Sequence, residues 1–199
     1  MPKLRFSMAL FTRNELLAKA AASSVYTTES YIREDAIGHI KASNAKIIEK
    51  ADRYDIFLSH SFEDARLVRA LRDELMSQGY TVYVDWIDDP LVDRTRVDKF
   101  SAELLRLRMR MSRSLLYATS ESSSKSLWMP WELGYMDGRT NSRVAIVPIV
   151  HEADSIKEFK GVEYLSIYPY LDKTGANLYI HRSIGKWTNF SKWIAGEII

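Results

Sequence analysis

One acid and two indoles gather at the expected start of a helix between Ser120 and Gly134. The segment reads Ser-Glu-Ser-Ser-Ser-Lys-Ser-Leu-Trp-Met-Pro-Trp-Glu-Leu-Gly. Proline is best tolerated in the first helical turn, so Pro130 places Glu132 in the first or second turn, where the helix dipole favours a carboxylate. Trp128 and Glu132 are four residues apart and should share a helix face. The spacing predicts an anion in an aromatic cup, and the alternative is a surface acid that only offsets the dipole.

The elements that must position this helix follow from the periodicity after Tyr54. The expected strands are 54–59, 80–85, 113–119 and 143–150, and the expected helices between them are 64–78, 98–111 and 129–138. The apolar repeats predict that the first helix buries Leu67, Leu71 and Leu75 and that the second directs Leu104, Leu107 and Met111 inward. Apolar strands joined by helices of this length indicate an α/β fold, a doubly wound parallel sheet covered on both faces. Beyond 150, the pattern predicts a short helix at 156–159, a fifth strand at 164–167, an extended segment at 177–181 and an amphipathic helix at 187–198.

Residues 1–51 are predicted to be a helical extension to a main domain of residues 52–199. Thr12 followed three residues later by Glu15 is a capping-box start for a helix that reaches Ala22. Apolar spacing predicts a second helix at about 30–50. These helices carry too little apolar surface to fold alone, so they should pack on the main domain, on a sister chain or on a partner.

Polar residues follow the predicted strands at one edge of the sheet. In an open α/β sheet, ligands bind outside the carboxyl ends of the strands, where the strand order reverses. If the order is flavodoxin-like, 2-1-3-4-5, the crevice lies between the first and third strands, and Ser59 faces Glu132. His60, Asp85 and Trp86 reach the same edge. An equally simple role for Ser59 and His60 is to satisfy backbone groups at a strand end.

Several classes of site are excluded by what these positions lack. A phosphoacceptor domain needs acids after the first strand and an acceptor aspartate ending the third, where this chain has Ser59-His60 and Thr119-Ser120. A dinucleotide or flavin phosphate site needs a glycine-rich first turn, which is missing. There is no P-loop and no nucleophile elbow, and the four histidines show no metal-ligand spacing, so no metal is expected.

Composition limits the partners further. The chain of 199 residues has no cysteine and a net charge of +2, which excludes thiol chemistry and gives no global sign of nucleic-acid binding. The longest apolar run, Val144 to Val150, is far shorter than the roughly 20 residues that span a bilayer, so we expect a cytoplasmic protein with no membrane partner. Arg106, Arg110 and Arg113 are expected to form a solvated face, and the alternative is contact with the phosphates of a ligand or with a neighbouring acidic chain. Trp187, Phe190 and Trp193 are expected in a core or interface.

Two motifs resemble those of Toll/interleukin-1 receptor (TIR) domains. Tyr54 to Ser61, Tyr-Asp-Ile-Phe-Leu-Ser-His-Ser, is similar to the first family motif. Ser126-x-Trp128-x-x-x-Glu132-Leu133 is similar to the Trp-Cys-x-x-Glu-Leu motif, with Met129 where cysteine is common. The resemblance covers about Asp52 to Ile167. It implies the flavodoxin-like five-stranded TIR fold, and the strings Asp85 to Pro90 and Trp128 to Glu132 narrow it to prokaryotic anti-phage proteins of the Thoeris type.

What the resemblance implies is an enzyme that consumes NAD+ as substrate, with no cofactor. Such a protein cleaves the nicotinamide glycosidic bond and makes a cyclic or conjugated ADP-ribose, which activates a separate effector. Self-association of TIR domains is also implied. Glu132 would be catalytic, and the residues expected to contact NAD+ are Ser59, His60, Phe62, Asp85, Trp86, Ser126, Trp128 and Trp131. The alternative is a non-catalytic TIR adaptor that acts by homotypic association, which has no requirement for Glu132.

Overall fold

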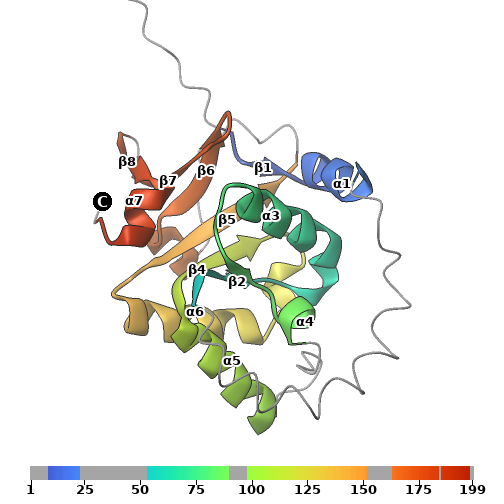
Figure 1. The fold of residues 1–199 in the computed structure, drawn as a ribbon, viewed down its shortest axis with the longest axis vertical. Coiled ribbons are helices and arrows are strands. Elements are labelled where there is room, and N and C mark those ends of the chain that lie inside the picture. Colours follow the sequence, from blue (N-terminus) through green and yellow to red (C-terminus); the bar gives the residue numbers. More distant parts are fainter. Residues whose placement is uncertain (1–8, 23–52, 90–97, 152–162, 184, 198–199) are drawn as a thin grey trace, which may run out of the picture.

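The computed structural model describes residues 9–22, 53–89, 98–151, 163–183 and 185–197. They form a central sheet with helices on both faces (Figure 1). The strands are β1 (Phe11–Thr12), β2 (Tyr54–Ser59), β3 (Val82–Tyr83), β4 (Ser112–Thr119), β5 (Val144–Val150), β6 (Tyr170–Thr174), β7 (Asn177–Ser183) and β8 (Lys186–Asn189). The α-helices are α1 (Arg13–Ala22), α3 (Ala65–Ser77), α4 (Asp85–Asp88), α5 (Lys99–Met111), α6 (Trp128–Thr140) and α7 (Phe190–Ala195). Short 3-10 helices are η1 (Phe62–Asp64), η2 (Ser123–Lys125) and η4 (Glu163–Ile167).

The sheet confirms the predicted strand order and extends it. Its order is β3-β2-β4-β5-β6-β7-β8, in which β3 to β6 are parallel neighbours in the 2-1-3-4-5 arrangement. Five strands were predicted, whereas the described part of the sheet has eight. β7 and β8 add an antiparallel hairpin to β6, and β1 pairs in parallel with β5.

Three predictions after residue 80 were wrong in detail. The strand expected at 80–85 is reduced to Val82–Tyr83, because Asp85 already begins α4. The segment expected as the fifth strand, 164–167, belongs to η4, and the fifth strand is Tyr170–Thr174. The helix expected at 187–198 is instead β8 followed by α7. Short apolar runs do not distinguish strand from helix by periodicity alone. The helices expected at 30–50 and 156–159 lie outside the described residues.

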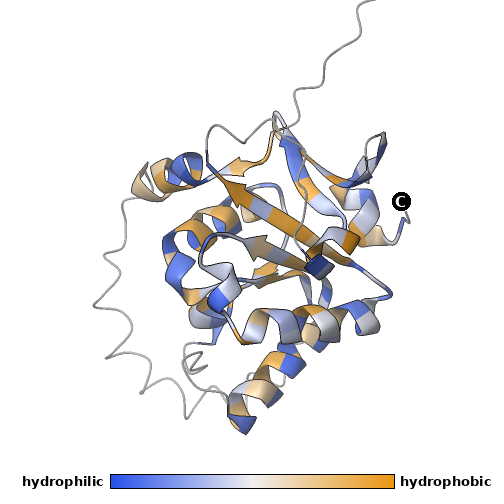
Figure 2. Cartoon of the chain, turned by 180° about the vertical axis from the view of Figure 1, so that it is seen from behind, coloured by the Kyte–Doolittle hydropathy of each residue, from blue (hydrophilic) through white to orange (hydrophobic). Residues whose placement is uncertain are grey.

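Two apolar layers hold the helices against the sheet, and apolar residues dominate the central strands in Figure 2. Alternate residues of each strand point to opposite faces. Ile56 and Leu58 of β2 face the layer that contains α1, α3 and α7, where Leu67, Leu71 and Leu75 are buried as predicted. Phe57 faces the layer that contains α5 and α6. Phe190 and Trp193 are core residues, whereas Trp187 on β8 is 54% exposed.

The described part of the N-terminal segment is continuous with this domain. Phe11 on β1 and Leu16 on α1 are fully buried in the same core as α3. The Oγ1 of Thr12 accepts from the amide of Glu15, the predicted capping contact. Ala9 bridges Lys173 on β6, so this segment contacts both β5 and β6. The sequence left open whether this helix packs on the main domain, on a sister chain or on a partner, and the structure shows that α1 packs on the main domain.

The inward face of α5 differs from the predicted one. Leu104, Leu107 and Met111 were expected inside but are only partly buried. The buried residues are Ser101, Leu105, Arg108 and Met109. Arg108 can lie inside because its guanidinium donates twice to Asp89, from Nε at 2.6 Å and from Nη2 at 2.8 Å.

Candidate active site

The centre of the site is a direct contact between the end of β2 and the second turn of α6. The hydroxyl of Ser59 donates to Oε2 of Glu132 at 2.6 Å. Both residues are 0% exposed. Because Pro130 lies in the first turn of α6, Glu132 comes one turn deep and points toward the sheet. The structure thus confirms that Ser59 and Glu132 face one another at the predicted edge.

Tyr117 lies beside this contact and was not identified from the sequence. It is the register partner of Ser59 on β4, and its side chain is 3% exposed. Burial raises the pKa of the Tyr117 phenol well above its usual value, and the neighbouring phenol of Tyr164 and the charge of Glu132 raise it further. The phenol therefore stays protonated at neutral pH. The signal available in the sequence was its position two residues before the end of β4, on the same face as Thr119.

His60 and Asp85 form a second contact at the same edge. The Nδ1 of His60 donates to the carbonyl of Leu58 at 2.8 Å, and its Nε2 lies 3.4 Å from Oδ1 of Asp85. Both side chains are about 1% exposed. The amide of Trp86 donates to the same oxygen of Asp85 at 2.9 Å. The prediction that these residues reach the same edge of the sheet is therefore confirmed, and the structure adds that His60 and Asp85 lie in contact there.

The tryptophans of α6 occupy two different environments. Trp128 is buried, and its indole N–H has no hydrogen-bond partner among the described residues. Trp131 packs edge-on against Trp128 at 5.6 Å and is covered by the guanidinium of Arg106 at 5.2 Å from its ring centre. Tyr135 contacts its other side at 6.2 Å. Trp131 is therefore directed at α5 rather than at Ser59, and its contact with a ligand stays a prediction.

The sequence matches the family model for the TIR domain over residues 56–180. The chain belongs to the TIR domain family. This TIR domain is also similar to a protein of Bacillus cereus (strain MSX-D12) named "Probable 3' cyclic ADP-D-ribose synthase ThsB'", with 41% identity over 193 residues, covering 94% of this chain and 98% of the relative. A second relative, "Putative cyclic ADP-D-ribose synthase TIR2" of Cytobacillus dafuensis, is 24% identical over 102 residues, which are 51% of this chain and 26% of that protein.

Two further predicted residues lie on the loops that rim this edge of the TIR domain. Phe62 on η1 is 55% exposed. Ser126 precedes α6, and its hydroxyl accepts from the amide of Met129 at 3.3 Å. The loops that carry them are joined, because Lys125 on η2 pairs with Glu63 on η1 at 3.2 Å. The roles of Phe62 and Ser126 stay predictions.

The chemistry available to this TIR domain at Glu132 is electrostatic. Among the residues that the structure describes, no group of three or more His, Asp or Glu side chains is placed to hold a metal ion. None of the helices in the described ranges is long and apolar enough to cross a membrane.

Since the Glu132 carboxyl has no solvent contact, a ligand reaches it only after neighbouring side chains move.

Proposed function

We propose that this TIR domain cleaves NAD+ at the nicotinamide glycosidic bond and makes a cyclic or conjugated ADP-ribose that acts as a signal in prokaryotic anti-phage immunity. The observation that carries the proposal is the buried Ser59–Glu132 contact at the carboxyl edge of β2 and β4. The names of both relatives, which describe cyclic ADP-D-ribose synthases, support it. Fold alone would not, because one fold serves many functions.

One carboxylate is sufficient for this reaction. Nicotinamide leaves as a neutral pyridine with the electron pair of the broken C–N bond, so no general acid is needed. Ordinary glycosidases need two carboxyl groups because their leaving oxygen must be protonated. Glu132 stabilises the positive charge that develops at the anomeric carbon and holds ribose hydroxyls. Ser59 fixes the direction of the carboxyl by donating to Oε2.

Exclusion of water decides the product. A hydroxyl of the same nucleotide that reaches the anomeric carbon forms a new C–O bond, releases its proton and closes a ring. Water at the same place would give free ADP-ribose. The first outcome requires that the side chains around Glu132, among them Ser59, Tyr117 and Trp128, close around bound NAD+ and keep water from the anomeric carbon.

The proposed function involves two kinds of partner, a separate effector protein and further copies of this TIR domain. We propose that the product activates a separate effector protein and that catalysis accompanies self-association of TIR domains. Self-association would also provide the rearrangement that opens Glu132 to NAD+. The domain itself needs no bound cofactor in this scheme, because NAD+ is the substrate.

Chromatography of nicotinamide released from NAD+ tests the proposal. Purified protein is assayed alone and with a phage-derived trigger, beside Glu132→Gln and the control Glu103→Gln, which changes a 60% exposed carboxylate on α5. We expect release by the wild type and by Glu103→Gln, and a loss of at least about 100-fold in Glu132→Gln. Release in no triggered condition, or equal release by Glu132→Gln, would leave the adaptor function instead.

A further inference from the structure

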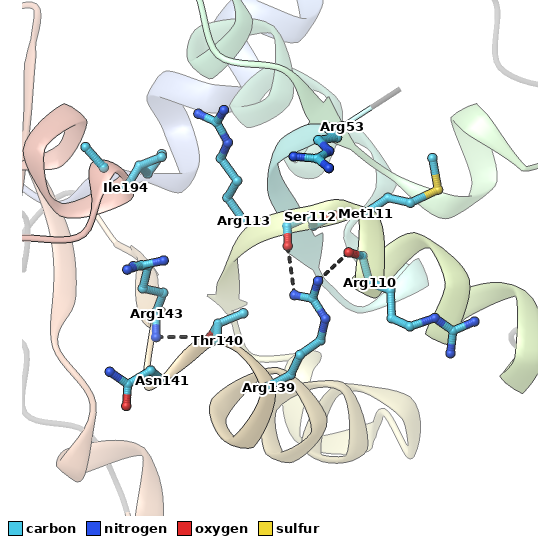
Figure 3. Close-up of a pocket in the computed structure, with 11 residues that line it drawn as sticks. Arg53, Arg110, Met111, Ser112, Arg113, Arg139, Thr140, Asn141, Arg143 and Ile194 are labelled. Atoms are coloured by element: carbon cyan, nitrogen blue, oxygen red, sulfur yellow. Dashed lines mark hydrogen bonds between the residues drawn. The ribbon is translucent and has the colours of Figure 1, made fainter. Parts of the chain in front are cut away.

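A cavity of about 890 Å³ lies at the edge of the sheet opposite Glu132 (Figure 3). The start of β4, the ends of α5 and α6, and α7 contribute to its wall. Its lining residues are Arg53, Arg110, Met111, Ser112, Arg113, Arg139, Thr140, Asn141, Arg143, Ile194 and Ala195. We call this the arginine pocket. β4 has eight residues and separates the two edges by about 23 Å, so the pocket is distinct from the Ser59–Glu132 site.

Two of the five arginines of the pocket are already engaged. Arg139 donates to the backbone carbonyls of Ser112 and Arg110, which fixes its guanidinium over the end of α5 (Figure 3). Arg113 pairs with Asp55 at 3.3 Å. Each guanidinium has five N–H groups, so both keep donors for a ligand.

The other three arginines, Arg53, Arg110 and Arg143, have no ion-pair partner among the described residues. Among the residues that the structure describes, no Asp or Glu lines the pocket, although the chain as a whole has 26 acidic residues. Three unpaired guanidinium groups repel one another in a concave surface. A bound anion would relieve that repulsion.

Arg110 and Arg113 are both exposed, in agreement with the predicted solvated face, but Arg113 lies on β4 and not on the helix that carries Arg110. The five arginines come from separate elements and line one surface hollow, with their guanidinium groups pointing in different directions (Figure 3). The guanidinium of Arg143 lies against Gly196. A Cβ at Gly196, where φ is 113°, would come within 2.8 Å of Nη2 of Arg143, so the absence of a side chain at this position leaves room for the guanidinium.

We propose that the arginine pocket binds a small anion that carries two or more phosphate groups. Guanidinium groups match phosphate oxygens with paired, charge-assisted hydrogen bonds. The volume of the hollow lies within the range of small-ligand sites, about 300–1,000 Å³. The site is independent of the proposed function.

Calorimetric titration with inorganic tripolyphosphate tests the proposal. The full chain is compared with Arg53→Ala/Arg110→Ala, whose two side chains are exposed and unpaired, and with Arg66→Ala, an exposed arginine at the start of α3 near the other edge. We expect binding by the wild type and by Arg66→Ala, and a loss of at least about tenfold in the double variant. Binding by Glu132→Gln should equal that of the wild type.

The same titrations define the results that would overturn the proposal. One is no binding of tripolyphosphate at 0.15 M salt. Another is an equal loss in Arg66→Ala, which would mean attraction by net charge alone. The last is tighter binding of octaglutamate than of tripolyphosphate, which would assign the pocket to an acidic protein segment. Circular dichroism of each variant confirms that a loss of binding is not a loss of fold.

Discussion

Ser59 and Glu132, 73 residues apart in the chain, share a buried hydrogen bond of 2.6 Å between the end of β2 and the second turn of α6. Replacing Ser59 by Ala removes this donor and loosens the orientation of the Glu132 carboxyl. We expect nicotinamide release to fall by about 10- to 100-fold, the scale of a small displacement in a catalytic group. Steady-state assays of Ser59→Ala and wild type measure this loss.

Ser114→Ala is the matched control for that variant. Ser114 is also a buried serine on a central strand, but its hydroxyl donates to the carbonyl of Asp55 near the opposite edge. Its loss should lower stability without a comparable effect on turnover per folded molecule. Equal losses of activity in the two variants would contradict a specific role for the Ser59–Glu132 contact.

Arg108→Met should destabilise the fold strongly. The change leaves Asp89 buried without the two guanidinium bonds, and only the hydroxyl of Tyr83 at 2.9 Å still donates to its carboxyl. The loss of unfolding free energy should be about 3–5 kcal/mol, measured by urea denaturation. The double variant Arg108→Met/Asp89→Leu should recover part of it, because no charge is then buried alone. A double variant no more stable than the single one would argue against this explanation.

Phe11→Ala tests whether the N-terminal segment belongs to the domain. Phe11 is fully buried on β1, so its truncation should lower the unfolding free energy by about 3–5 kcal/mol. Leu127→Ala is the control, because that side chain is 78% exposed and should have little effect. Urea denaturation should show a single shifted transition for Phe11→Ala. An unchanged midpoint would mean that β1 is an appendage.

The raised pKa of Tyr168 predicts that the folded protein loses stability at high pH. Burial, and then the hydrogen bond from its hydroxyl to Asp137 at 3.1 Å, raises the pKa of Tyr168 to about 12, whereas an unfolded tyrosine titrates near pH 10. The folded state resists deprotonation, so this contribution is complete below about pH 10 and declines as pH rises toward 12. The stability difference between wild type and Tyr168→Phe should therefore shrink over that interval. Urea denaturation of both proteins at pH 8, 10 and 11 measures the difference, and a constant value would contradict the prediction.

Local patterns in the sequence were sufficient for the central architecture. The continuous apolar run in β2 and the recurrence of Leu67, Leu71 and Leu75 in α3 are local properties, since each can be seen along a single element. The rule that ligands meet the carboxyl ends of strands then placed Ser59 opposite Glu132. Motif spacing gave the same pair independently.

Long-range contacts were beyond those patterns. Arg108 is charged, so periodicity placed it outside, yet the bidentate partner Asp89 makes its burial possible. β5 lies between β4 and β6, and β1 pairs only with its last residues, Ile149 and Val150. Which backbone groups remain available there after folding is a property that no segment carries by itself.

The sequence by itself determined the α/β class of the fold and the identity of the acid at the candidate site, because periodicity and motif spacing act over a few residues, and the resemblance to TIR domains added the strand order. Only the tertiary structure decided that Tyr117 adjoins Glu132 and that arginines from five places in the chain meet around one cavity. Those relationships arise when distant segments pack together, and the physical reason is that packing selects neighbours in space rather than along the chain.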